Sequence, residues 1–548
     1  MGNCLHAKKK GPLPIETSFS FPSPVPSWNS DEGFASGLID IGGLELQQVS
    51  TFTKVWSVLQ GGPDDLGFSF FRPTELPTGF FILGHYAQPN NKPLSGQIIV
   101  ARDATGTTSP ILKAPLDFTL IWSSQNSNVK QSVSAYFWLP SPPEGYRSVG
   151  LAVTDMPEKP SVNEFRCVRN DFTEECEAGS SIWNDDKDGI SLLPLRPLNR
   201  GVQALGVPVS TFLVQKSSSP TVSAIACLKN NRTDFTRWMP TLSQIQTLMQ
   251  NFSPWIYLHP NEPYLPSSVN WFFKNGALLY QKDNQVPIPI QTDGSNLPQG
   301  GSNDDSFWID LPTDNSQMEM VKKGDITSTE VYLHVKPMLG ATCTDIAIWV
   351  FYPFNGPARA KVEFVNISLG KIGEHVGDWE HVTLRISNFT GELLSMYFSE
   401  HSGGIWVDAS QLEFEGGNRP VAYSSLNGHA FYSKPGLVLQ GDSKLGIGIR
   451  NDTAKGTRMD VGQRYKFVSV NYIGVAEPAW LNYVKKWGPK KSYDTTKELE
   501  KVVRLLPKKL KDRLEKMIES LPAEVLGEEG PTGPKGKSNW FNDEQYTF

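Results

Sequence analysis

The residues best suited to chemistry gather in one run of the sequence, from Gly373 to Val382 (Gly-Glu-His-Val-Gly-Asp-Trp-Glu-His-Val). In a strand that begins near Asp378, the side chains of Asp378 and Glu380 lie on one face, because successive side chains alternate. Two neighbouring carboxylates repel each other unless a cation or a shared proton lies between them. His375, in the glycine-flanked loop just before, can swing onto the same side. The spacing therefore predicts a cation site.

The type of cation follows from the type of ligand. One imidazole with several oxygens suits Mg²⁺, Ca²⁺ or Mn²⁺ better than zinc. Further histidines, His381, His401 and His429, are candidates for ligand binding or for support of the site. The alternative is structural: Asp378 and Glu380 are solvated or paired with Arg or Lys, and His381 is a surface residue.

Standard catalytic signatures are missing from the sequence. It has no HExxH zinc motif, no Gly-x4-Gly-Lys-Ser/Thr phosphate loop and no Gly-x-Ser-x-Gly nucleophile turn. A cation at Asp378 and Glu380 that activates water, with His401 or His429 as general base, would give a metal-dependent hydrolase. No catalytic residue is assigned, and a binding role is favoured over an enzymatic one.

Composition narrows the class of protein. The 548 residues carry a net charge of −6, which argues against nucleic acid as a partner. With 47 Gly, 41 Pro and 11% aromatic residues, the chain favours many short strands over long helices. No apolar run approaches the roughly 18 residues of a membrane span, and the first residues lack a signal-peptide core. We therefore expect a location in the cytosol or on the cytoplasmic face of membranes.

A repeat marks the first half of the chain. The segment Gly79–Gly84 recurs as Gly145–Gly150, and a fainter third copy is Gly201–Gly206. An aliphatic residue and a tryptophan precede each copy, and the tryptophans are Trp56, Trp122 and Trp183. Three units, each too short to bury its own apolar face, predict three sheets around one shared core. The alternative is a chance recurrence of Pro-Gly turns in a β-sandwich.

The domain organisation follows from these patterns. We expect a flexible leader over residues 1–41, a pseudo-threefold β-prism-like domain over 42–230 and a helical linker over 231–254. Residues 255–482 alternate strand patterns and Gly/Asn turns, as in a β-sandwich that carries the cation site. Residues 483–548 contain an amphipathic stripe interrupted by a proline and predict basic helices and a tail. The fold class is mainly β.

The first ten residues suggest a membrane anchor. Gly2 can be myristoylated after removal of Met1, Cys4 can be palmitoylated, and Lys8–Lys10 can attract anionic lipid. Two acyl chains give stable binding where one gives only marginal binding. An unmodified leader with a few lysines is the alternative.

Several longer segments carry a resemblance to a known family. They are His259–Val269, Gly373–Val382, Ser399–Gly404 and Gly417–Ala430. Through them the chain resembles plant members of the vacuolar protein sorting-associated protein 62 family, whose domain has no established biochemical activity. The resemblance covers nearly everything beyond residue 40 and implies a role in membrane trafficking.

A remoter likeness bears on the cation site. The necrosis- and ethylene-inducing peptide-like toxins have a Gly-His-Arg-His-Asp-Trp-Glu motif, which His375, Asp378, Trp379 and Glu380 match at the same spacing. The segment ending at Asn355 resembles the toxin segment that ends in an Asp ligand. The toxins hold a divalent cation on a β-sandwich and bind sphingolipid head groups.

Together the two resemblances imply a peripheral membrane protein that binds membrane lipids or glycolipid head groups. Its divalent cation would be held by Asn355, His375, Asp378 and Glu380. A metal-dependent hydrolase and a non-catalytic scaffold are the alternatives, and the sequence identifies no protein partner.

Overall fold

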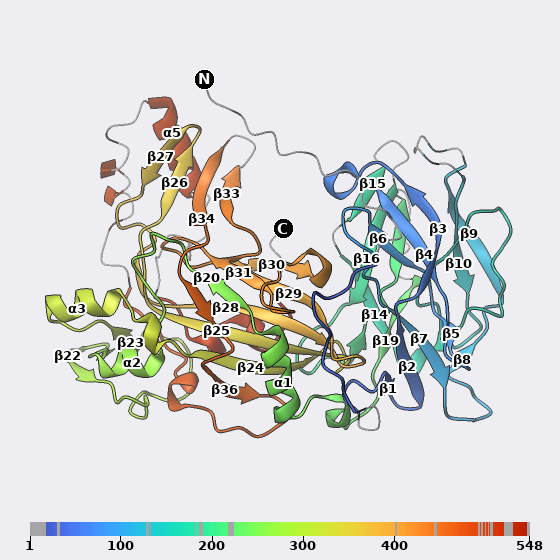
Figure 1. The fold of residues 1–548 in the computed structure, drawn as a ribbon, viewed down its shortest axis with the longest axis horizontal. Helices are drawn as coiled ribbons and strands as arrows, with labels where there is room; N and C mark the ends of the chain where they lie inside the picture. Colours follow the sequence, from blue (N-terminus) through green and yellow to red (C-terminus); the bar gives the residue numbers. More distant parts are fainter. Residues whose placement is uncertain are drawn as a thin grey trace.

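Two β-rich bodies lie side by side in the computed structural model of the chain (Figure 1). The blue-to-cyan half of the sequence forms one body and the green-to-red half forms the other. The structure describes residues 18–29, 33–125, 127, 131, 133–179, 181–185, 190–216, 224–400, 403–442, 446–490, 494, 497–498, 500–501, 504, 508–519 and 530–544.

The first body repeats one six-strand pattern three times. In each repeat the second, third and fifth strands pair with one another, as do the first, sixth and fourth. In the third repeat the first and third strands also pair, so all six strands form one sheet. The first repeat comprises β2 (Leu44–Val49), β3 (Phe52–Val58), β4 (Phe68–Pro73), β5 (Phe81–Ile82), β6 (Tyr86–Pro89) and β7 (Ile98–Asp103), and β1 (Leu38–Asp40) pairs with β2. The second comprises β8 (Leu112–Lys113), β9 (Asp117–Ser123), β10 (Tyr136–Ser141), β11 (Tyr146–Arg147), β12 (Ala152–Thr154) and β13 (Cys167–Arg169). The third comprises β14 (Thr173–Ala178), β15 (Trp183–Asp185), β16 (Ile190–Pro197), β17 (Gly206–Val207), β18 (Phe212–Lys216) and β19 (Ala226–Lys229).

The three repeat tryptophans meet in one apolar core, as the sequence predicted. Trp56, Trp122 and Trp183 are all buried in the same cluster, and the rings of Trp56 and Trp122 lie 6.2 Å apart. Two of them also link neighbouring repeats, because the indole N–H of Trp56 donates to the Val133 carbonyl and that of Trp183 to the Gln60 carbonyl. Each repeat thus contributes to a core that none could form alone.

In the first two copies of the repeat, the second glycine lies where the repeats meet. A Cβ placed on Gly84 would lie 2.8 Å from the Cα of Gly150, so these two backbones touch. The third place belongs to Thr211, whose Cγ2 lies 2.6 Å from a Cβ built on Gly150, and not to Gly206. The equivalent of β5 and β11 in the third repeat is β17, which begins at Gly206, so the third copy is shifted along the chain.

A six-stranded sheet is the centre of the second body, in the order β30-β29-β28-β25-β24-β36. Its strands are β24 (Val331–Met338), β25 (Cys343–Asn355), β28 (His375–Ser387), β29 (Leu393–Glu400), β30 (Gly403–Asp408) and β36 (Tyr465–Val470). The long strands β25 and β28 are buried on both faces along nearly their whole length, and in β25 the run Ile346–Phe354 is accordingly apolar throughout.

Separate layers cover the two faces of this sheet. One face packs on α1 (Leu242–Phe252) and on the sheet of β20 (Trp255–Tyr257), β31 (Val421–Ser424), β32 (Phe431–Tyr432) and β35 (Arg458–Asp460). The other face packs on α2 (Val269–Lys274), α3 (Asn315–Lys322), β21 (Leu278–Gln281), β22 (Asn284–Pro289) and β23 (Phe307–Asp310). Helix α1 begins with a capping box, in which the Thr241 hydroxyl accepts from the Gln244 N–H.

A smaller sheet projects from the second body at the upper left of Figure 1. Its order is β27-β26-β34-β33, and its strands are β26 (Arg359–Val362), β27 (Val365–Ser368), β33 (Gly436–Asp442) and β34 (Ile447–Thr453). Helix α5 (Lys508–Glu519) packs on β26 and β34 through the buried Leu514. Within the described residues, no helix is long and apolar enough to cross a membrane.

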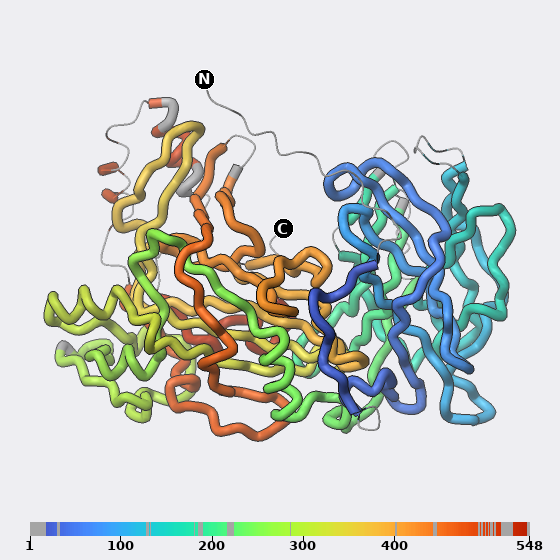
Figure 2. Tube along the Cα trace, in the orientation of Figure 1, coloured from blue at the N-terminus to red at the C-terminus, as the bar shows by residue number. Residues whose placement is uncertain are grey.

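Both ends of the described chain are packed more closely than the sequence suggested. The leader was expected to be flexible, but its described residues, 18–29 and 33–41, run in dark blue between the two bodies in Figure 2, with Trp28 against the buried Phe34. At the other end, Trp487 and Trp540 are fully buried within the second body. The reason is the same in both places: aromatic side chains in Pro-, Ser- and Gly-rich stretches have no helical or strand period, yet burying each one is strongly favourable.

Candidate binding pocket

The site lies at one end of the central sheet, where its longest strands meet: β25 ends there and β28 begins there. β25 and β28 pair antiparallel, with Tyr352 opposite Asp378 and Asn355 opposite His375. This register brings Asn355, at the end of one strand, to His375, at the start of the other. The segment between them forms the β26–β27 hairpin.

A glycine in β28 changes which face the side chains occupy. Val376 and Trp379 share one apolar cluster, although strict alternation would place them on opposite faces of the strand. The alternation breaks at Gly377, whose φ of +64° is the left-handed region that favours glycine. A side chain there would also collide with Trp487, whose backbone oxygen would lie 2.5 Å from the added Cβ. His375 is thereby turned to the side of Asp378, as the sequence analysis allowed.

The four predicted residues line one pocket of about 340 Å³. Asn355, His375, Asp378 and Glu380 share it with His381, Tyr397 and Ser399 from β28 and β29, and with Leu426, Asn427 and Gly428 from the loop after β31. Asp378, Glu380 and Asn355 each expose less than a tenth of their surface. The pocket is therefore a polar recess at the end of a hydrophobic sheet.

Hydrogen bonds fix the orientations of the Asn355 and His375 side chains in the pocket. The Asn355 amide nitrogen donates to the carbonyls of Gly356 and Gly373, at 3.1 and 2.7 Å. The Nδ1 of His375 lies 3.1 Å from the Gly377 carbonyl, which makes Nδ1 the donor and leaves the lone pair on Nε2. Burial lowers the pKa of His375 below its ordinary value, which favours the neutral ring.

Asp378 is held by a buried chain of charges. Its Oδ2 accepts from the Nδ1 of His429 at 2.9 Å, and the Nε2 of His429 lies 3.6 Å from Glu262. Burial opposes a charged imidazole, but the two carboxylates outweigh it and raise the pKa of His429 to about 9. Burial would likewise raise the pKa of Asp378, but the hydrogen bond from His429 and the charge of that imidazolium hold it below its usual value. The His429 ring also stacks on Tyr352, with centroids 3.8 Å apart.

The other acid and the next histidine have different partners. Glu380 accepts from the Ser399 hydroxyl. His381 is buried between Trp349 and Tyr397, and its Nε2 lies 3.1 Å from the Glu544 carboxylate. Both acids of the motif are thus buried rather than solvated, and His381 is not a surface residue.

Sequence reasoning missed a whole wall of the pocket. Residues 530–544 form a C-terminal strap that lines it with Pro531, Thr532, Gly536, Lys537, Ser538 and Asn539. Glu544 anchors the strap, because its fully buried carboxylate also accepts from Thr383 and lies 3.6 Å from Lys336. Two tryptophans, Trp487 and Trp540, in a stretch expected to be a tail were the available signal.

The strap also joins the two bodies. Asp543 accepts from Arg385 in the second body at 2.7 Å and from Arg200 in the first at 3.1 Å. A second link is Lys92, whose ammonium lies 2.8 Å from Asp408. The pocket is therefore built on a frame to which both bodies contribute.

The pocket offers mostly oxygen donors and one imidazole nitrogen, which is the kind of ligand set that a hard divalent cation prefers. The Asn355 side-chain oxygen, the His375 Nε2 and the second Asp378 oxygen are not used by the hydrogen bonds described above. Among the residues that the structure describes, however, no three His, Cys, Asp or Glu side chains are already grouped as a metal site. His429 relieves part of the carboxylate repulsion from which the cation was inferred, so a cation here stays a prediction.

Three of the residues named from the sequence lie outside the described residues: His401, Gly2 and Cys4. His429 lies beside the pocket, and both its ring nitrogens face carboxylates. Glu262 was part of a quoted family segment, but no spacing rule connected it with the site.

Solved structures give remote likenesses only. The crystal structure of GNIP1Aa from Chromobacterium piscinae is 18% identical, over 38% of this chain and 40% of that one, with a TM-score of 0.29. A structure described as "Toxin fold as basis for microbial attack and plant defense" is 13% identical, over 39% of this chain and 75% of that one, with a TM-score of 0.21.

Sequence comparisons reach further. The vacuolar protein sorting-associated protein 62 of Saccharomyces cerevisiae is 23% identical over 281 residues, which is 43% of this chain and 58% of the yeast protein. The yeast protein TDA6 is 24% identical over 292 residues. The chain thus spans rather more than half the length of each curated relative it matches. A family model matches residues 15–544, and the chain belongs to the vacuolar protein sorting-associated protein 62 family.

Proposed function

We propose that the pocket binds the polar head group of a membrane lipid or glycolipid through a divalent cation, and that the chain serves membrane trafficking. Asn355, His375, Asp378 and Glu380 would hold the cation, which would be Mg²⁺, Ca²⁺ or Mn²⁺. When bound, it would supply a positive centre for the oxygens of the head group. The trafficking part of the proposal draws on membership of a family named for vacuolar protein sorting.

One observation carries the proposal: the left-handed turn at Gly377. Without it, His375 would lie on the far face from Asp378 and Glu380. With it, an imidazole and two carboxylates from one strand face the same pocket as Asn355 from the next. Collecting buried acids around a polar recess costs stability, and such a cost is typical of a functional site.

The surrounding groups favour binding over hydrolysis. A general base needs a free lone pair near the reacting water. His429 has none to offer, since both ring nitrogens face carboxylates and the side chain is fully buried. Its position instead suits a residue that orients Asp378. The hydrolase alternative would then depend on His401, which the structure does not describe.

Basic side chains at the rim suit an oxygen-rich ligand. Arg359, Arg450 and Lys537 line the same pocket as Asp378 and Glu380, and the two arginines are held there by ion pairs with Asp452. A sugar or a phosphate-bearing head group presents the hydroxyls or negative oxygens that such cations and a bound metal ion would both contact.

Titration of the full chain with soluble head groups tests the proposal. Glycerophosphoinositol, glycerophosphoserine and free hexoses would be titrated with Ca²⁺ or Mn²⁺ present, and again with a chelator. We expect at least one of them to bind only when the cation is present, and His375→Ala to weaken that binding about tenfold or more. Asp460→Asn is the matched control, because Asp460 is an ion-paired acid of the same body that does not line the pocket. Binding unchanged by the chelator would overturn the proposal.

The peripheral membrane location is a separate part of the proposal and rests on Gly2, Cys4 and Lys8–Lys10. Fractionation of cells that express the wild type or Gly2→Ala tests it. Loss of the first acyl chain should shift the protein to the soluble fraction, since one remaining chain binds only marginally. Equal soluble fractions for the two proteins would remove the acyl anchor from the account.

A further inference from the structure

The projecting sheet grows directly from the rim of the pocket. Asn355 ends β25, His375 begins β28, and the β26–β27 hairpin is the chain between them. At its foot, Arg359 of β26 and Arg450 of β34 line the pocket. The pocket and the far end of this sheet are therefore joined directly by the β26–β27 hairpin and by β34.

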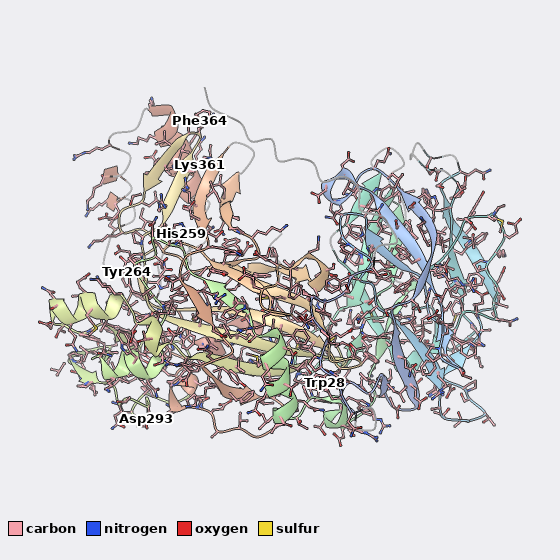
Figure 3. All side chains as sticks on the ribbon, in the orientation of Figure 1. Trp28, His259, Tyr264, Asp293, Lys361 and Phe364 are labelled. Carbon is pink, nitrogen blue, oxygen red and sulfur yellow. The ribbon has the colours of Figure 1, made fainter. Side chains whose placement is uncertain are left out.

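The far end of the projection exposes apolar side chains. Phe364, in the turn between β26 and β27, is 95% exposed, the highest value among the large exposed hydrophobic residues of the described chain. Figure 3 shows Phe364 at the outer end of the projection, with Lys361 behind it toward the body. Val365, next to it, is also exposed, so two adjacent apolar side chains face solvent at the tip. Leu437 and Val438 of β33 are exposed too, but they lie at the foot of the sheet, opposite Asp452 and Asn451. Contiguous exposed apolar groups mark contact sites more often than single ones do.

The tip is held firmly in spite of its exposure. The Glu363 N–H donates to the Gly446 carbonyl at 3.1 Å, which ties the β26–β27 turn to the neighbouring hairpin. The Glu363 carboxylate accepts from Arg513 of α5. Helix α5 lies against β26 and β34, so its buried Leu514 supports the sheet from one side. The Phe364 ring is thus presented on a supported turn.

The charge of the projection is opposite to that of the chain. Residues 359–371 contain three basic residues and one acidic residue, and α5 contains five basic and three acidic residues. These two segments carry a net charge of +4, whereas the whole chain carries −6. A basic surface around an apolar tip complements an anionic lipid surface, which attracts the charges and takes up the ring.

We propose that the tip around Phe364 is a membrane-docking wedge that inserts into the interface of an anionic bilayer. The wedge rests on the proposed function, because it would place the head-group pocket at the membrane surface. At about 3.3 Å per strand residue, the tip lies roughly 10–15 Å beyond Arg359. Interfacial elements are immersed by about 5–10 Å, so the rim of the pocket would lie within reach of the head groups.

Vesicle flotation of the full chain, produced without acylation, tests the wedge. The vesicles are phosphatidylcholine with or without phosphatidylserine. We expect binding to the vesicles with phosphatidylserine, and Phe364→Asp to weaken it about tenfold or more, because a buried aromatic ring is replaced by a charge. Phe364→Trp should bind at least as well as the wild type, since tryptophan favours membrane interfaces. Lys361→Glu should weaken binding about fivefold and make it less sensitive to salt.

Leu116→Asp is the matched control. Leu116 is 72% exposed but lies in the first body, away from the projection, so its change should leave flotation as it is. Equal flotation of wild type and Phe364→Asp would overturn the wedge, and so would a wild type that binds neither vesicle, because a protein partner would then fit the tip better. Phe364→Asp should keep cation-dependent head-group binding in solution, so failure of the wedge and failure of the pocket are distinguishable.

Discussion

His85 of the first body and His429 of the second are both buried, but their pKa values are shifted in opposite directions. Burial and the charge of Arg72 lower the pKa of His85 to about 3. His429 lies between Asp378 and Glu262, and its pKa is raised to about 9. His85 is therefore buried as a neutral ring and His429 as a charged one, whereas His334 of the second body is like His85, because burial lowers its pKa as well.

The difference extends to the two cores. The threefold core holds aromatic and aliphatic side chains, and the backbones of Gly84 and Gly150 touch beside it. The second body carries buried acids and bases along the same sheet: Asp378 with His429, Asp345 with Arg385, and Glu544 with His381. Buried charges are costly, and a chain that needed only a stable fold could replace them with apolar residues. We infer that the first body is a scaffold and that the second holds the site.

The largest expected effect comes from breaking a buried ion pair of the second body. Asp345→Asn leaves Arg385 without its bidentate partner, at 2.8 Å for both hydrogen bonds, and we expect it to lower the free energy of unfolding by about 3–5 kcal/mol. Urea denaturation measures the change. Asp117→Asn, which removes an equally short but exposed ion pair with Lys159 in the first body, should leave stability unchanged. Equal losses for both variants would erase the contrast between the bodies.

Acid should destabilise the first body through His85. Its pKa is lowered from 6.5 to about 3 on folding, so the unfolded chain takes up a proton that the folded chain does not. Stability is complete above pH 6.5 and falls by up to about 1.4 kcal/mol per pH unit as the pH drops toward 3. His85→Gln, which cannot be protonated there, should show a shallower pH dependence in urea titrations. An identical dependence in both proteins would contradict the assignment.

The threefold axis should tolerate no added methyl group. Gly150→Ala would place a Cβ 2.9 Å from the Cα of Gly84, and we expect a loss of about 1–3 kcal/mol from the forced backbone shift. Gly145→Ala is the matched control: its φ of +80° carries backbone strain, but no atom lies within 4 Å of the added carbon, so the loss should be smaller, about 1 kcal/mol. If urea denaturation showed a larger loss of stability for Gly145→Ala than for Gly150→Ala, the threefold axis would not pass beside Gly150.

Side-chain alternation and the sequence repeat predicted those parts of the structure that depend on residues close in sequence or on a repeated unit. The recurring Trp56, Trp122 and Trp183 marked the shared core. The alternation of Asp378 and Glu380 on one face also holds. Each of these depends on neighbours in the sequence or on a repeated unit, and periodicity records both.

The missed features depend on contacts between distant segments. His429 was named as a candidate from the sequence, but its hydrogen bond with Asp378, 51 positions away, was not predicted. The contact of Glu544 with His381, across 163 positions, was not predicted either. No period or spacing encodes such pairs, because they follow from the order of strands in the sheet. The shift of the third repeat from Gly206 to Thr211 escaped for a related reason: the axis needs a small group at that point, and threonine can take the place of glycine there.

Cation content tests the central claim most directly. Wild type, His375→Ala, Asp378→Asn and the control Asp460→Asn would be dialysed against Ca²⁺ or Mn²⁺ and analysed for bound metal, with unfolding curves to show that each variant is folded. We predict about one equivalent in the wild type and the control, and a loss of at least tenfold in affinity in the two pocket variants. A folded wild type that binds no cation, or pocket variants that bind it as tightly as the wild type, would contradict the account.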